Sequence, residues 1–474
     1  MTTRKPIDLL KIERGTVTAP AGCGKTQLIA DALTRHESAK PILVLTHTNA
    51  GVVALRGRFD RAGVPARAYR LLTIDGWAMR LVSTFPARSA HDPVLLTLAH
   101  PQTDYPNIRA AAARLLRAGH ITDVLAASYD RLVVDEYQDC SVRQHALVAY
   151  AAKTLHTAVL GDPLQAIFGF GADQLANWDD VTKYFPVAGQ LDTPWRWINA
   201  GAEPLGRWLL NVREKLLRGD PIDLRKVPDG VEWVQLDGSD DHAKRLAAAG
   251  VRAPGKDPCV LIIGDSTSPA SQRKFASQTS GAITVEAVEL RDLVAFARRF
   301  DLGRRDALDQ LAGFAESVMT NVGAADFAAR VRALRASRKI EGASDLDRSA
   351  IQFMDQPDYP AAIEVLVEIG KQGGVRTHRP AVLRACIRAL QLCHGTDGLS
   401  FHDAATRMRE QNRLVGRPLP RRAVGSTLLL KGLEGDVAVV LNAAALDARN
   451  LYVAMTRGSK RLIVCSPNPV LPPG

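Results

Sequence analysis

Short apolar segments rich in β-branched residues alternate with amphipathic helical segments along the first third of this 474-residue chain. The strand-like segments are 16–20, 42–48, 131–137 and 157–162, and the helical segments between them are 27–36, 49–59 and 141–155. Alternation of this kind is typical of a parallel sheet wrapped by helices. We therefore expect an α/β fold.

A similar alternation returns late in the chain, in 258–265, 436–444 and 460–466, and it predicts a second α/β unit. Residues 301–422 are instead rich in Ala, Arg and Leu with helical periodicity, so we expect a helical insertion in the second unit. A shorter helical segment, 98–128, interrupts the first unit.

Composition narrows the class of protein. Lys and Arg number 61 against 50 Asp and Glu, a net charge of +11 that favours polyanionic partners. The apolar runs are too short to span a bilayer and the N-terminal segment has no signal-peptide core, so we expect a cytoplasmic protein without membrane contact. Six cysteines without a C-x-x-C pair predict neither a disulfide framework nor structural zinc.

The first chemical motif is APAGCGKT, residues 19–26, which lies between a strand and a helix. Small residues let backbone N–H groups curl around a β-phosphate, and the helix N-terminus adds its positive end. Lys25 is expected to reach the β- and γ-phosphates, and the Thr26 hydroxyl to bind Mg²⁺. The predicted nucleotide-binding residues of this loop are Ala21, Gly22, Cys23, Gly24, Lys25, Thr26 and Gln27.

The second motif is a pair of carboxylates, Asp135 and Glu136, at the end of the strand in RLVVDEYQD. Side chains alternate along a strand, so one carboxylate can hold Mg²⁺ while the other orients the attacking water. We assign Asp135 to Mg²⁺ and Glu136 to the water. Such a pair alone is more often a solvated strand end, but the upstream phosphate loop favours the catalytic interpretation.

These two motifs and five further segments occur in the order found in UvrD/Rep-like superfamily 1 DNA helicases, which the chain resembles. DEYQDCSVRQ and VLGDPLQAIFGFGAD resemble motifs II and III, LTHTNAGVVALRGRF motif Ia, and LDTPWRWIN motif IV. LLLKGLEGDVAVVL resembles motif V and ARNLYVAMTRGSKRL motif VI.

The resemblance implies two RecA-like P-loop domains, each with a mainly helical insertion. Domain 1A is expected at 1–88 and 128–194 with insertion 1B at 89–127. Domain 2A is expected at 195–300 and 423–474 with insertion 2B at 301–422.

The resemblance also implies that ATP and Mg²⁺ bind between the two domains. Arg196 and Arg457 would meet the γ-phosphate, Trp195 would stack on adenine, and Gln165 would sense the γ-phosphate. Gly432 and Glu434 would join the site from motif V.

Single-stranded DNA, or its junction with a duplex, is the implied partner. Phe168 and Phe170 occupy positions that contact bases in the family, although two phenylalanines so spaced are by themselves more often core residues. Thr46, His47, Thr48 and Asn49 would meet the DNA strand. Trp77 is either a base contact or a packing residue.

The chain departs from the family pattern at several positions. No glutamine precedes the phosphate loop, Gly171 replaces an arginine, His47 replaces an aromatic residue, and Ser426, Thr427 and Leu428 stand where a Thr-x-His element is usual. The ATP chemistry is thus expected to be intact and its coupling to DNA altered.

Two functions follow. One is an ATP-dependent 3′ to 5′ helicase or single-strand translocase. The other is a DNA-stimulated ATPase that acts as a sensor or regulatory subunit beside a nuclease, as in antiphage defence pairs of the Gabija type, and unwinds little alone.

Overall fold

The computed structural model describes residues 7–168, 173–255, 257–286, 290–337, 342–412 and 420–471. By its internal contacts the chain divides into two compact units, residues 1–235 with 443–474, and residues 236–442. The segments 195–235 and 443–474, which the sequence assigns to domain 2A, thus belong to the first unit.

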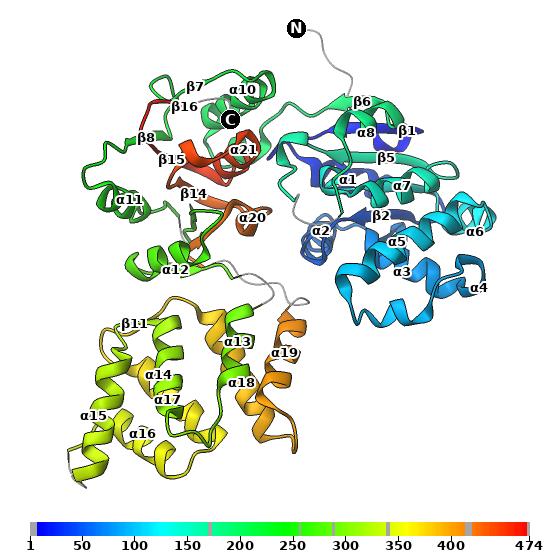
Figure 1. Ribbon diagram of the computed structural model, residues 1–474. Helices are drawn as coiled ribbons and strands as arrows, with labels where there is room; N and C mark the ends of the chain where they lie inside the picture. Colours follow the sequence, from blue (N-terminus) through cyan, green and yellow to red (C-terminus); the bar gives the residue numbers. More distant parts are fainter. Residues whose placement is uncertain are drawn as a thin grey trace. The chain divides into compact units, whose positions relative to one another are not determined.

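A six-stranded sheet forms the centre of the first unit, with the strand order β3-β2-β4-β5-β1-β6 (Figure 1). Its adjacent strands run parallel, as the alternating sequence pattern predicts. The strands are β1 (Arg14–Thr18), β2 (Ile42–Thr46), β3 (Tyr69–Thr73), β4 (Arg131–Val134), β5 (His156–Gly161) and β6 (Val187–Gln190).

Both faces of this sheet are covered. Along β2, Leu43 and Leu45 pack into one apolar core, while Ile42 and Val44 pack into another. Successive side chains of a strand point to opposite faces, so two cores require helices on both sides. The helices of this unit are α1 (Lys25–Thr34), α2 (Asn49–Arg61), α3 (Ile74–Thr84), α4 (Pro86–Ser89), α5 (Pro101–Arg117), α6 (Thr122–Ser128), α7 (Val142–Ala151), α8 (Trp178–Tyr184), α9 (Trp195–Asn199), α10 (Glu203–Arg218) and α21 (Ala448–Met455).

A second six-stranded sheet consists of β8, β9, β10, β13, β14 and β15, and this confirms the predicted α/β class with two parallel sheets. In the second unit β10 pairs with β13, β13 with β9, and β9 with β14, all in parallel. In the first unit β15 pairs in parallel with β8. The bounds are β8 (Val231–Gln235), β9 (Val260–Ile263), β10 (Ile283–Thr284), β13 (Arg422–Gly425), β14 (Gly435–Val440) and β15 (Gly458–Ser466). Two-residue strands β7 (Ile222–Asp223) and β16 (Val470–Leu471) also pair in the first unit.

The second unit carries a bundle of helices with its own apolar core (Figure 1). Helical periodicity predicted segments that the structure contains as α14, α15 and α18, with a short antiparallel pair of strands, β11 (Met319–Thr320) and β12 (Arg376–Thr377), between them. The bundle helices are α13 (Arg291–Arg299), α14 (Ala307–Val318), α15 (Ala324–Ser337), α16 (Asp345–Asp355), α17 (Tyr359–Lys371), α18 (Pro380–His394) and α19 (Phe401–Asn412); α11 (Asp241–Ala249), α12 (Pro269–Gln278) and α20 (Thr427–Leu430) complete the unit. No helix among the described residues is long and apolar enough to cross a bilayer.

Candidate active site

The phosphate-loop motif lies between β1 and α1, as the sequence predicts. Gly22 and Gly24 have φ angles of 71° and 87°, a left-handed conformation that L side chains rarely adopt. Gly24 is the residue directly before α1, so the loop lies at the N-terminus of that helix, which is the positive end of the helix dipole. Lys25 and Thr26 then form the first turn of α1, while Gln27 is exposed and donates to Asp31 (2.7 Å).

Lys25 contacts both carboxylates of the second motif. Its Nζ lies 3.0 Å from Asp135 Oδ1 and 2.5 Å from Glu136 Oε1. Burial acts to lower the pKa of Lys25, but the two carboxylates outweigh it and the pKa is raised. Burial raises the pKa of Asp135 against the attraction of Lys25. The structure therefore brings the two sequence motifs into one charged cluster.

The residues present fit a magnesium-bound triphosphate. Asp135 is a buried carboxylate directly after β4, and Thr26 supplies a hydroxyl at the start of α1. Such oxygens are the ligands that Mg²⁺ prefers, and Lys25 beside them is suited to phosphate oxygens. Glu136 has a φ of 54°, a strained backbone for a residue with a side chain. Strain of this kind is concentrated at functional sites, where surrounding structure maintains it.

Helix α9 packs directly on the phosphate loop. The Arg196 N–H donates to Gly22 O (3.0 Å), and a Cβ placed on Gly24 would lie 3.1 Å from Trp195 Cδ1. Trp195 lies beside the loop and keeps 51% of its surface exposed.

The two candidate arginines of the first unit meet at Thr456. Arg196 Nη1 donates to the Thr456 carbonyl (2.7 Å), and Arg457 Nη2 donates to the Thr456 hydroxyl (3.0 Å). Arg457 is buried, and its Nε donates to Val453 O (2.8 Å) in α21. Arg196 is thus tied to the loop through its backbone and to motif VI through its side chain.

Sequence reasoning missed two residues that connect this cluster. Trp197 is 1% exposed and its Nε1 donates to Gly458 O (2.9 Å). The Tyr452 hydroxyl accepts from the Ala21 N–H (3.2 Å). Burial raises the pKa of this phenol well above its ordinary value. The alternating W-R-W pattern could have indicated that one tryptophan faces the interior.

Arg213 of α10 was missed as well. It forms a fully buried ion pair with Asp162, with Nη2 2.9 Å from Oδ1. Asp162 follows β5 as Asp135 follows β4, and its carboxylate also accepts from Gln165 Nε2 (3.2 Å). The position of Arg213 on the apolar face of α10, next to Val212, was the available signal.

On the predicted DNA side, His47 and Phe168 lie together with ring centroids 5.5 Å apart. Thr48 caps α2 by accepting from the Gly51 N–H (3.0 Å), Thr46 is buried and Asn49 is exposed. These residues thus surround the end of β2.

The remaining DNA and motif V candidates are distributed elsewhere. Trp77 is 1% exposed within a core cluster, which agrees with its packing alternative. Phe170 lies outside the described residues. Gly432 and Glu434 belong to the second unit, where they are exposed in the turn between α20 and β14.

A parallel sheet with a phosphate loop after β1 and carboxylates after β4 defines a P-loop nucleotide-binding fold. Residues 96–186 match the model of the UvrD/REP helicase N-terminal domain. The resemblance to UvrD/Rep-like superfamily 1 helicases is therefore confirmed, and the matched segment contains the carboxylates that follow β4.

Among solved structures, the Pif1 helicase from Candida albicans is similar at 13% identity, with a TM-score of 0.31. The alignment covers 56% of this chain and 51% of that one, so it spans about half of the solved relative. A search of curated proteins gave no match.

Proposed function

We propose that this chain hydrolyses ATP in the presence of Mg²⁺ and uses the reaction to move 3′ to 5′ on single-stranded DNA, as a cytoplasmic helicase or translocase. The single observation that supports this most is the position of Lys25, which contacts Asp135 and Glu136 at the start of α1. This arrangement contains a phosphate-binding cation, a metal-binding carboxylate and a candidate base in one place.

In the proposed reaction Lys25 transfers from the carboxylates to the β- and γ-phosphates when ATP binds. Glu136, released from the lysine, can accept a hydrogen bond from the attacking water and orient it in line with the γ-phosphate. Magnesium, when bound, neutralises charge on the phosphate oxygens. Arg196 supplies a further cation beside the loop, and the Trp195 indole offers a stacking face for the base.

The segment from Asp162 to Phe168 is suited to connect ATP with DNA. The Gln165 side chain donates a hydrogen bond to Asp162, and Arg213 of α10 holds Asp162 in place through an ion pair. Three residues further along, Phe168 packs against His47 at the end of β2. A shift of Gln165 on meeting a γ-phosphate would therefore be transmitted along a short backbone segment to the proposed DNA surface.

A specific observation favours the second candidate, an ATPase sensor that works beside a nuclease. Where the family uses a Thr-x-His element, the Ser426 hydroxyl accepts from the Leu429 N–H (3.2 Å) and so caps α20. A hydroxyl engaged in a cap is less available for DNA coupling.

Paired assays test the proposal. The full chain is assayed for ATP hydrolysis with and without single-stranded DNA, and for strand separation on forks with a 3′ or a 5′ tail. DNA-stimulated hydrolysis with unwinding of the 3′-tailed fork supports the helicase. Stimulated hydrolysis without unwinding supports the sensor, and hydrolysis that DNA does not change contradicts both.

A further inference from the structure

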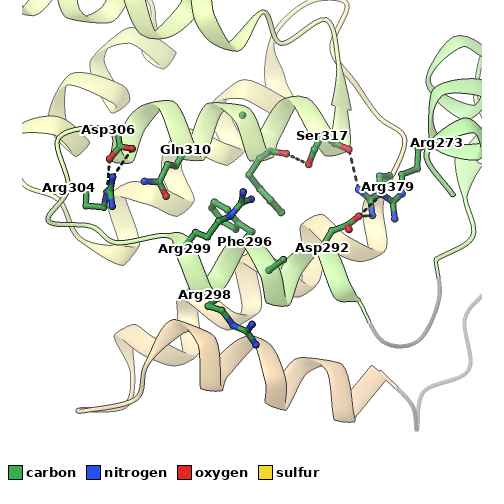
Figure 2. A pocket seen from close by; sticks show the side chains of 13 residues that line it. Arg273, Asp292, Phe296, Arg298, Arg299, Arg304, Asp306, Gln310, Ser317 and Arg379 are labelled. Atoms are coloured by element: carbon green, nitrogen blue, oxygen red, sulfur yellow. Dashed lines mark hydrogen bonds and ion pairs between the residues drawn. The ribbon is translucent and has the colours of Figure 1, made fainter. Parts of the chain in front are cut away.

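The helical bundle of the second unit contains a cavity that the proposed ATP chemistry does not use. Its volume is about 850 Å³, and it is lined mainly from α13, α14 and the loop that joins them (Figure 2). Its lining includes five arginines, Arg273, Arg298, Arg299, Arg304 and Arg379.

Two of these arginines are neutralised at one end of the cavity. Arg379 is buried and contacts both oxygens of Glu286 (2.5 and 2.9 Å), and its Nη2 lies 2.7 Å from Asp292. Arg273 lies 2.7 Å from the same Asp292 carboxylate. The carboxylates hold these guanidinium groups in place, which makes that end of the cavity rigid.

At the other end Arg304 is paired with Asp306 (2.9 Å) (Figure 2). Arg298 and Arg299 differ, because within the described ranges no acidic side chain forms an ion pair with either. Both are exposed in the last turn of α13. Cations at a helix C-terminus are favourable in themselves, but that effect does not explain why both line a cavity that holds three more arginines.

Size and chemistry together indicate the class of ligand. The volume lies in the range of roughly 300–1,000 Å³ that is typical of small-molecule sites. Guanidinium groups match phosphate oxygens in geometry and charge, and Arg298 and Arg299 have no ion-pair partner in the part of the chain that the structure describes. The lining also includes Gln310 and Phe296, which are available to the remainder of a ligand.

We propose that this cavity binds a small phosphate-bearing ligand, with Arg298 and Arg299 as the principal phosphate-binding residues. The ligand is either a nucleotide or free pyrophosphate, since both present the same phosphate oxygens. The DNA backbone is the less favoured alternative, because a strand binds along an extended groove whereas this site is concave.

Calorimetric titration of the full chain tests the proposal. The Lys25→Ala substitution is introduced throughout so that the phosphate loop contributes little. Pyrophosphate, a nucleoside diphosphate and a single-stranded oligonucleotide are titrated separately. In that background we expect Arg298→Gln/Arg299→Gln to weaken binding of at least one of the two small probes by roughly tenfold or more.

A matched pair on α18, Arg384→Gln/Arg388→Gln, controls for net charge. Both residues are exposed and lie outside the cavity lining. Affinity that falls with the α13 pair and not with the α18 pair, and that Arg298→Lys/Arg299→Lys largely retains, supports the site. A stronger response to the diphosphate than to pyrophosphate assigns the ligand as a nucleotide, and the reverse assigns it as pyrophosphate.

Three results overturn the proposal. The first is that neither small probe binds. The second is that both substitution pairs weaken binding equally. The third is that only oligonucleotide binding depends on the α13 pair, which would make the cavity part of a DNA surface. Because the readout is binding in a chain with a disabled phosphate loop, none of these results depends on ATP hydrolysis.

Discussion

Trp197 lies so close to Gly22 that a Cβ at position 22 would sit 2.5 Å from the indole Cζ3. The phosphate loop is therefore packed tightly against the buried tryptophan of α9. A side chain at position 22 would have to displace either the loop or α9, and α9 carries Arg196 and Trp195.

Gly22→Ala tests this packing, with Gly63→Ala as its matched control. The two glycines have similar φ angles of 71° and 68°, but nothing lies within 4 Å of a Cβ at position 63. The control should lose about 1 kcal/mol of unfolding free energy from backbone strain. Gly22→Ala should lose more and should also lower ATP turnover. Equal losses in stability and unchanged turnover would contradict the packing argument.

Lys25→Ala should lower ATP turnover by on the order of 10²- to 10³-fold, because a preorganised cation at the phosphates is removed. Binding of single-stranded DNA should change little, since the contacts of Lys25 at the start of α1 are with Asp135 and Glu136 and not with the predicted DNA residues. Lys11→Ala, at an exposed position of the same unit, provides the control. Normal turnover in Lys25→Ala would remove the phosphate-loop assignment.

Glu136→Gln should separate binding from chemistry. The amide keeps the shape of the side chain but cannot accept a proton, so hydrolysis should fall by roughly 10²- to 10⁴-fold while ATP stays bound. Retention of labelled ATP on a filter measures the trapped state. Glu37→Gln, an exposed substitution, should leave both quantities unchanged. If ATP affinity falls as far as turnover, Glu136 is a binding residue and not the base.

Arg213 and Asp162 form a buried ion pair, so removal of the arginine should leave a buried carboxylate without its partner. Arg213→Met should destabilise the chain by about 3–5 kcal/mol, because Asp162 would stay buried without its partner. Adding Asp162→Asn removes that charge and should recover part of the loss. Denaturant unfolding of the two single variants and the double variant measures the coupling, and purely additive losses would refute it.

His378 should make the second unit sensitive to mild acid. Burial, helped by Arg379, Arg376 and Arg273, lowers its pKa to about 4. Between this pKa and the unfolded value near 6.5, only the unfolded chain binds the proton, so stability falls as the pH falls through that window. The loss should reach on the order of 2–3 kcal/mol near pH 4.

Thermal unfolding of the full chain across that window measures the effect. His378→Gln should flatten the pH dependence, whereas His120→Gln, at an exposed histidine, should leave it unchanged. A slope that persists in His378→Gln would assign the sensitivity to other groups.

The sequence alone determined the α/β class, the place of the phosphate loop between β1 and α1, and the carboxylates after β4. These features depend on local periodicity and on short motifs, which a chain carries wherever its segments pack. The same reasoning located α14, α15 and α18 from their apolar spacing.

Tertiary structure decided which distant residues meet. Nothing local to Gly22 indicates Trp197, nothing near Asp162 indicates Arg213, and the arginines of the α13–α14 cavity come from segments about 100 residues apart. Burial also showed that Trp77 is a packing residue, because an aromatic ring suits a base contact and a core equally well until its neighbours are known. The physical reason is that contact, burial and pKa depend on the groups that packing brings within a few ångströms, and helix and strand periodicity specifies only which face of an element is apolar.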